Sequence, residues 1–97
     1  MKHLVPTVSQ DIETPYGALR YHKYPDGRIR FNLGSIMEMV MDEFSRYLND
    51  EGMSTVSVSD FDVMLKDFEQ GVRNEVTRAK AVRKALAEAE SKIKRFD

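Results

Sequence analysis

Apolar residues recur at alternating four- and three-residue steps between residues 61 and 96, with one interruption at Glu75. This spacing predicts a long helix over 59–96 that carries a heptad seam on one face. Gly71 favours a kink, and Glu75 either pairs with an arginine such as Arg78, fixes the register, or marks where the helix leaves its partner. The seam needs a partner surface, either another segment of this chain or a second copy, and we expect a homodimer. The seam residues are Phe61, Leu65, Phe68, Val72, Ala79, Val82, Leu86, Ala89, Ile93 and Phe96.

Alternating apolar and polar residues on both sides of Pro25-Asp26-Gly27 predict a β-hairpin over 16–33. Proline presets the backbone of such a turn, and glycine accepts the left-handed residue that follows. If Tyr24 pairs with Arg28, one face belongs to the core and the other carries a basic ribbon. The expected core face consists of Leu19, Tyr21, Ile29, Phe31 and Leu33. The polar side chains of this ribbon, together with the adjacent Lys23, are candidate nucleic-acid contacts. They are Arg20, His22, Lys23, Arg28, Arg30 and Asn32.

A second apolar stripe predicts a helix over 35–50. Ser35 and Glu38 have the spacing of a capping box at its start, and Gly52 supplies the stop. Met39 falls outside the stripe and is a candidate contact point. The stripe consists of Ile36, Met37, Val40, Met41, Phe44, Tyr47 and Leu48.

The remaining segments complete an α+β domain in which the hairpin packs on a helix and a long C-terminal helix closes the core. Residues 1–15 contain two prolines, so they predict an extended arm or a short edge strand. The β-rich Thr55–Val58 segment adds a short strand, after which Ser57 or Ser59 caps the last helix. A chain of 97 residues is long enough for one small domain.

Composition limits the function classes. The chain has no cysteine, no apolar run near the ~18 residues of a membrane span, and no signal-peptide pattern. We therefore expect a cytoplasmic protein without membrane contact.

Charge is segmented along the chain. Residues 1–33 carry five Lys/Arg against three Asp/Glu, residues 34–69 carry two against nine, and residues 70–97 carry eight against four. The acidic segment offers a protein-binding surface that can imitate nucleic-acid phosphates, or it is simply the solvated face of two helices. Its candidate contacts are Glu38, Asp42, Glu43 and Asp67.

The order of a strand, a helix and a second helix over residues 28–70 resembles the architecture of the ribbon-helix-helix DNA-binding proteins. In that family a short strand pairs across a dimer, so the resemblance implies base reading by Arg28, Arg30 and Asn32. Two features depart from the family. The strand is already paired in a local hairpin, and the connection over 49–59 is longer than the family's tight turn.

No catalytic, cofactor-binding or metal-binding motif is recognisable. Asp60 and Asp62 suit a helix N-terminus better than acid–base chemistry, and His3 and His22 lack a coordinating spacing. We therefore predict a non-enzymatic regulatory protein that binds a protein partner, one form being an inhibitor of a nucleic-acid-handling complex of phage or mobile-element type. The alternative is a dimeric DNA-binding regulator that uses the basic hairpin and the basic C-terminal helix.

Overall fold

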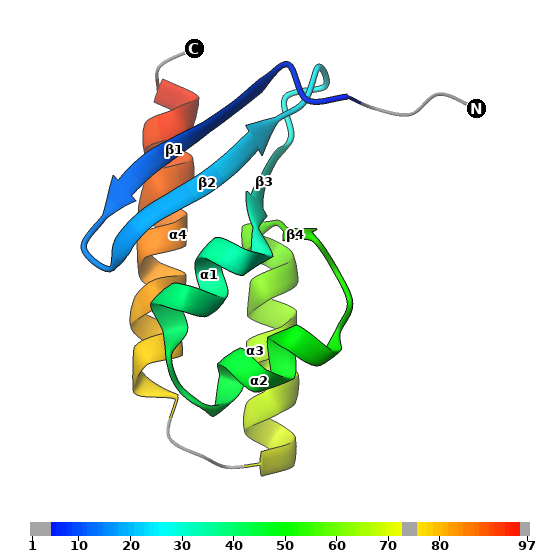
Figure 1. The fold of residues 1–97 in the computed structure, drawn as a ribbon, viewed down its shortest axis with the longest axis vertical. Coiled ribbons are helices and arrows are strands. Elements are labelled where there is room, and N and C mark those ends of the chain that lie inside the picture. The colour runs from blue at the N-terminus through cyan, green and yellow to red at the C-terminus, as the bar shows by residue number, and fades with distance from the viewer. Residues whose placement is uncertain (1–4, 73–75, 96–97) are drawn as a thin grey trace.

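The computed structural model describes residues 5–72 and 76–95, with the backbone alone at Val72. It contains a four-stranded antiparallel sheet whose strands lie in chain order, together with four helices (Figure 1). The predicted α+β class is confirmed. The strands are β1 (Val8–Thr14), β2 (Gly17–Lys23), β3 (Ile29–Asn32) and β4 (Thr55–Val56). The helices are α1 (Leu33–Val40), α2 (Glu43–Asp50), α3 (Val58–Val72) and α4 (Thr77–Arg95).

The predicted hairpin and its register are present. Tyr21 pairs with Phe31, and the backbone N–H of Tyr24 donates to the carbonyl of Arg28 at 2.9 Å. Gly27 closes the turn at φ 91°, a conformation that glycine adopts without steric cost. The expected core face is buried, with Tyr21 packed at its margin; its most buried members are Leu19, Ile29, Phe31 and Leu33.

The N-terminal segment forms an edge strand, one of the two alternatives that its prolines left open. All seven residues of β1 pair with β2, so the sheet begins earlier than the predicted hairpin. A turn at Pro15 and Tyr16 joins the two strands. The Thr14 hydroxyl stabilises this turn because it accepts from the Tyr16 N–H at 3.1 Å and donates to the Gly17 carbonyl at 2.8 Å.

The predicted helix over 35–50 is two helices, because α1 ends at Val40 and α2 begins at Glu43. The predicted capping box is also wrong. Asn32 is the N-cap of α1, and its Oδ1 accepts from the backbone N–H of Ser35 at 3.0 Å. The chain turn after Val40 reverses the expectation for two methionines: Met39 is buried, whereas Met41 is exposed.

The strand that the ribbon-helix-helix resemblance assigned to a dimer contact is internal to the sheet. β3 pairs with β2 on one side and with β4 on the other. One edge of β3 is occupied by β2, and β4 occupies the other edge at Phe31 and Asn32. β3 is therefore not a free strand that could pair across a dimer in the manner of that family. The short strand predicted at Thr55 and Val56 supplies the second of these partners.

The predicted long helix is likewise two helices, α3 and α4, which lie side by side and run in opposite directions (Figure 1). Ion pairs tie them together: Glu69 to Lys80 at 2.8 Å, and Asp62 to Arg83. The capping prediction for α3 is correct, since the Ser57 hydroxyl accepts from the Asp60 N–H at 3.1 Å.

The heptad seam finds its partner within the chain, one of the two alternatives that its pattern left open. The homodimer stays a prediction. The described seam residues are buried in the core of one chain, so they are not available as a dimer contact. The side chain of Val72, together with Glu75 and Phe96, lies outside the described residues. The seam residues in the single-chain core are Phe61, Leu65, Phe68, Ala79, Val82, Leu86, Ala89 and Ile93.

Candidate functional site

The corner between α1 and α2 combines two unfavourable features at one residue. Met41 has φ 53°, which makes it the one described residue other than glycine in the left-handed region. A side chain in that region costs roughly 1–2 kcal/mol relative to glycine. Met41 is also 75% exposed, so burial recovers little of this cost. Stability of the free protein therefore does not explain a methionine here.

Asp42 holds the corner in place through both carboxylate oxygens. Oδ1 accepts from the backbone N–H of Phe44 at 2.9 Å and caps α2. Oδ2 accepts from the backbone N–H of Ala79, in the first turn of α4, at 3.2 Å. The Ser45 hydroxyl adds a third contact, because it donates to the Met37 carbonyl at 3.3 Å. These bonds fix the backbone on both sides of Met41.

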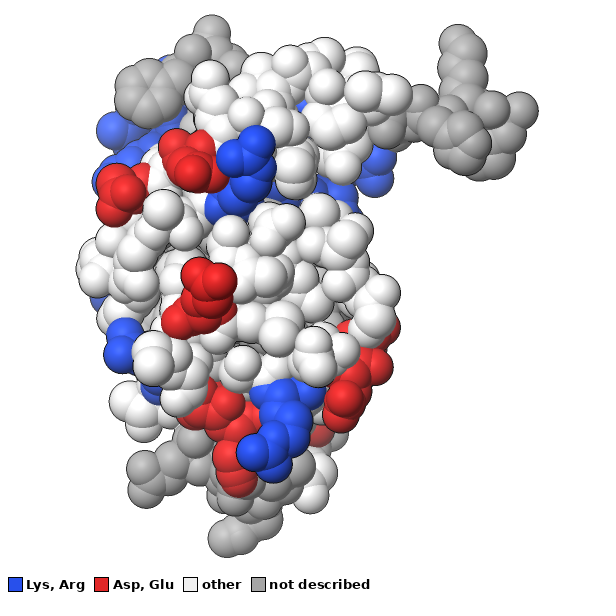
Figure 2. All heavy atoms as spheres, in the orientation of Figure 1, with Lys and Arg blue, Asp and Glu red and all other residues white. Residues whose placement is uncertain are grey.

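Acidic residues rim the corner. Glu38 on α1 and Glu43 at the start of α2 are exposed, and both lie within one helical turn of Met41 along the chain. Figure 2 shows acidic side chains over α1 and α2 on this face of the molecule. Three of the four predicted acidic contacts, Glu38, Asp42 and Glu43, therefore meet at one corner, although the Asp42 carboxylate is used internally.

The fourth predicted contact, Asp67, lies on α3 beside a different group. Burial raises the pKa of the Tyr47 hydroxyl, and the carboxylates of Glu51 and Asp67 raise it further. Tyr47 stacks on Phe44 at 5.6 Å and contacts Phe68 at 5.3 Å. This aromatic cluster packs α2 against α3 and so positions the corner between α1 and α2.

The predicted basic ribbon is largely paired within the sheet. Arg20 pairs with Asp11 on β1 at 3.1 Å, and the His22 Nδ1 lies 2.7 Å from the Ser9 hydroxyl. In the upper part of Figure 2, where Figure 1 shows β1 and β2, acidic and basic side chains lie next to each other. Lys23, also a candidate contact, is half-buried and makes further interactions.

Arg30 and Asn32 have structural roles. The Arg30 guanidinium donates to the Thr55 hydroxyl and the Thr55 carbonyl, both at 2.9 Å, and pairs with Asp60 at 3.1 Å. It thus ties β3 to β4 and to the start of α3. Asn32 caps α1, as described above.

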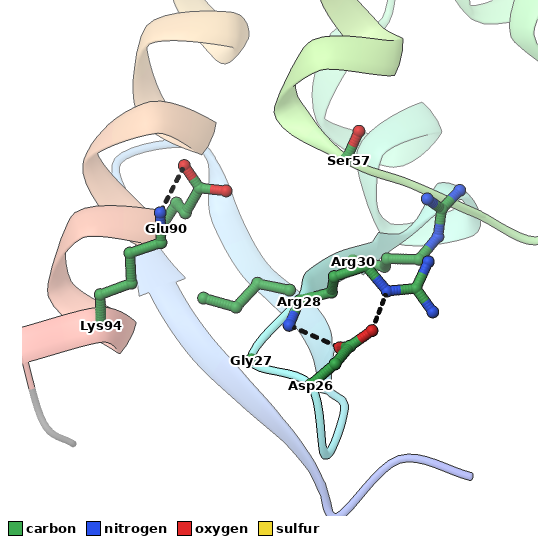
Figure 3. A pocket seen from close by; sticks show the side chains of 8 residues that line it. Asp26, Gly27, Arg28, Arg30, Ser57, Glu90 and Lys94 are labelled. Carbon is green, nitrogen blue, oxygen red and sulfur yellow. Dashed lines mark hydrogen bonds and ion pairs between the residues drawn. The ribbon is translucent and has the colours of Figure 1, made fainter. Parts of the chain in front are cut away.

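A cavity of about 390 Å³ opens between the hairpin turn, the start of α3 and the last turns of α4 (Figure 3). Arg28 lines it, pairs with Asp26 at 2.8 Å and lies over the Tyr24 ring at 5.4 Å. Lys94 lies 3.9 Å from Glu90 across one helical turn. The cations that line this cavity already face carboxylates. The cavity therefore attracts an anion less strongly than the same cations would without these partners.

Comparison with models of known protein families, with curated proteins and with solved structures finds no match for this chain. Within residues 5–72 and 76–95, no three His, Asp or Glu side chains are grouped so that they could hold a metal ion. None of the helices in this part of the chain combines the length and the apolar character of a membrane span. Function must therefore be inferred from the geometry of the chain itself.

Met41 is the residue that sequence reasoning missed, because its apolar side chain continues the helical stripe. A local signal does exist. Asp42 followed by Glu43 has the form of a helix N-cap and an acidic first turn, which predicts a new helix at this point. With that boundary, Met41 falls in the connection.

Proposed function

We propose that this protein is a non-enzymatic regulator that binds another protein through the α1–α2 corner. Met41 is the anchor, and Glu38 and Glu43 form its charged rim. One observation carries the proposal: a large apolar residue is 75% exposed on a strained backbone that is held on both sides. Strained backbone that the surrounding structure maintains is typical of functional sites.

The chemistry of the corner suits a protein partner. Interfaces combine an apolar centre with a polar rim, and a few buried anchors supply most of the binding free energy. Methionine is unbranched and polarisable, so it fits an apolar pocket of irregular shape. The carboxylates of Glu38 and Glu43 complement basic residues around such a pocket.

Proteins that handle nucleic acids present basic surfaces or grooves to the phosphate backbone. Occupation of such a surface by the acidic corner would block it, which is the inhibitory form of the proposed function. The binding then depends on Met41 for affinity and on the two glutamates for the rate of association, since rim charges act mainly on that rate.

The test is capture of a partner from a lysate of the source cells by three immobilised proteins: the wild type, Met41→Ser and Val63→Ser. Val63 is a matched control because it is a 58% exposed apolar residue on the outer side of α3. We expect the same protein to be retained by the wild type and by Val63→Ser and to be lost from Met41→Ser. Equal retention by all three proteins would refute the corner as the contact surface.

A further inference from the structure

Helix α4 carries a large excess of positive charge, and much of it is unpaired. Between Thr77 and Arg95 there are seven Lys/Arg and two Asp/Glu. Four of the seven cations have partners within the chain. Arg78 lies over the Tyr16 ring at 5.0 Å, Lys80 and Arg83 pair with α3, and Lys94 faces Glu90. The other three cations are exposed and have no ion-pair partner among the described residues; they are Lys84, Lys92 and Arg95.

These three cations share one side of the helix. At 100° per residue, Arg95 lies about 20° from Lys84 around the helix axis and Lys92 about 80° from it. The opposite side of α4 carries Val82, Leu86 and Ile93, which are buried in the core. At 1.5 Å per residue, the cations extend over roughly 16 Å along the axis. They therefore form a stripe that faces solvent, called here the α4 basic stripe.

The surroundings of the stripe favour a charged, hydrophilic partner. The uncharged residues on the same side as these cations are small, namely Ala81, Ala87 and Ser91, so a backbone can approach closely. A helix that lies on a membrane needs large apolar residues beside its cations. The large apolar residues of α4 are instead buried in the core. Glu88 is the one acidic residue on this side, and the stripe keeps a net positive charge in its presence.

We propose that the α4 basic stripe binds the phosphate backbone of a nucleic acid without base-specific contacts. The charge complementarity of three unpaired cations with a polyanion carries the inference. It transfers nucleic-acid contact from the hairpin, whose arginines are paired, to the three α4 cations that have no ion-pair partner among the described residues. It does not depend on the corner, and a nucleic acid and a protein partner can occupy the two surfaces together.

The test is fluorescence anisotropy of a random-sequence DNA duplex titrated with the full chain between 50 and 200 mM salt. Neutralisation of about three phosphates predicts a slope near −2.7 in log K against log salt concentration. The variant Lys84→Glu/Arg95→Glu should weaken binding at least tenfold. The control Arg46→Glu/Lys66→Glu changes the net charge equally at exposed cations outside α4 and should weaken it much less.

Two further measurements define the outcome. Glu88→Gln should strengthen duplex binding, because it removes the anion on the stripe. Vesicles that contain anionic lipids should bind more weakly than the duplex at equal salt. Absence of salt-dependent duplex binding, equal loss in both charge variants, or preference for the vesicles would each overturn the proposal.

Discussion

The Asp42 carboxylate accepts a hydrogen bond from the backbone N–H of Ala79 at 3.2 Å, across 37 residues of chain. Its other oxygen caps α2 at Phe44. One side chain thus satisfies N–H groups at the start of two helices and holds the corner on which Met41 stands. Such groups have no partner within their own helix, so their loss is costly when they are shielded from water.

Asp42→Ala should lower the free energy of unfolding by about 2 kcal/mol, since it removes two caps that each contribute about 1 kcal/mol. Asp42→Asn keeps one carbonyl oxygen as an acceptor and should cost about half as much. Urea unfolding followed by far-UV circular dichroism measures both. An alanine variant as stable as the wild type would show that neither hydrogen bond contributes.

Met41→Gly separates stability from binding. Glycine relieves the steric cost at φ 53° but loses more conformational entropy on folding, so we expect a net gain of up to about 1 kcal/mol in the free energy of unfolding. Partner capture should be lost in the same variant. A variant that unfolds more easily than the wild type would mean that the Met41 side chain packs on the fold, which removes the reason to regard it as an anchor.

Acid should weaken the fold through two carboxylates of α3, Asp60 and Asp62. The hydrogen bond from Arg83 lowers the pKa of Asp62 below its usual value of 3.8, and the backbone hydrogen bond from Ser57 lowers that of Asp60. A carboxylate with a lowered folded-state pKa stabilises the fold above its unfolded-state pKa, and this contribution is lost as the pH falls through the folded-state value. The free energy of unfolding should therefore decrease as the pH is lowered below about 4.

Asp62→Asn is the matched variant for this pH dependence. It should be less stable than the wild type at pH 6, and the difference should shrink as the pH approaches 2, because the wild-type carboxyl is then protonated. Urea unfolding at several pH values gives both curves. Parallel curves for the two proteins would contradict a role for the Asp62–Arg83 pair.

Two arginines of the predicted basic ribbon should differ in their effect on stability. Arg30→Ala removes three contacts made by a side chain that is 23% exposed, and should cost about 1–3 kcal/mol. Arg20→Ala removes an ion pair whose two side chains are about half exposed, and should change stability by less than about 0.5 kcal/mol. Thermal unfolding of the two variants checks this, and equal costs would count against a structural role for Arg30.

The hairpin could be predicted in detail because two independent signals agree there. Alternation fixes which side chains face the core, and Pro25-Asp26-Gly27 fixes the turn, so the pairing of Tyr21 with Phe31 follows. The start of α3 could be predicted to within two residues, with Ser57 or Ser59 as the cap, and the contacts between Ser57 and Asp60 select Ser57. In both cases the decisive contacts join residues close in sequence.

The corner could not be predicted from periodicity. Val40, Met41 and Phe44 continue one apolar stripe, yet the helix stops at Val40 because Asp42 caps α2 and is bound by Ala79 from α4. The second of these contacts is tertiary and leaves no trace in the local pattern. The same reason explains α3 and α4: the heptad spacing continues across both helices, and the pattern does not reveal that the chain folds back on itself.

The first strand could be predicted only as one of two alternatives. Pro6 and Pro15 exclude a continuous helix and allow either an extended arm or a short edge strand, and the chain forms the edge strand. Pro15 occupies the second position of the turn that joins β1 to β2, and Gly17 the fourth, which is typical of a type I turn.

Methionine oxidation tests the corner most directly, because the side chains themselves report exposure. In the free protein Met41 should oxidise faster than Met39 and Met64, which are buried. In the complex with the captured partner, Met41 should be protected, while Met53, which is 39% exposed in the connection after α2, should oxidise at its free rate. Oxidation of Met41 at an unchanged rate in the complex would contradict the corner as the binding site.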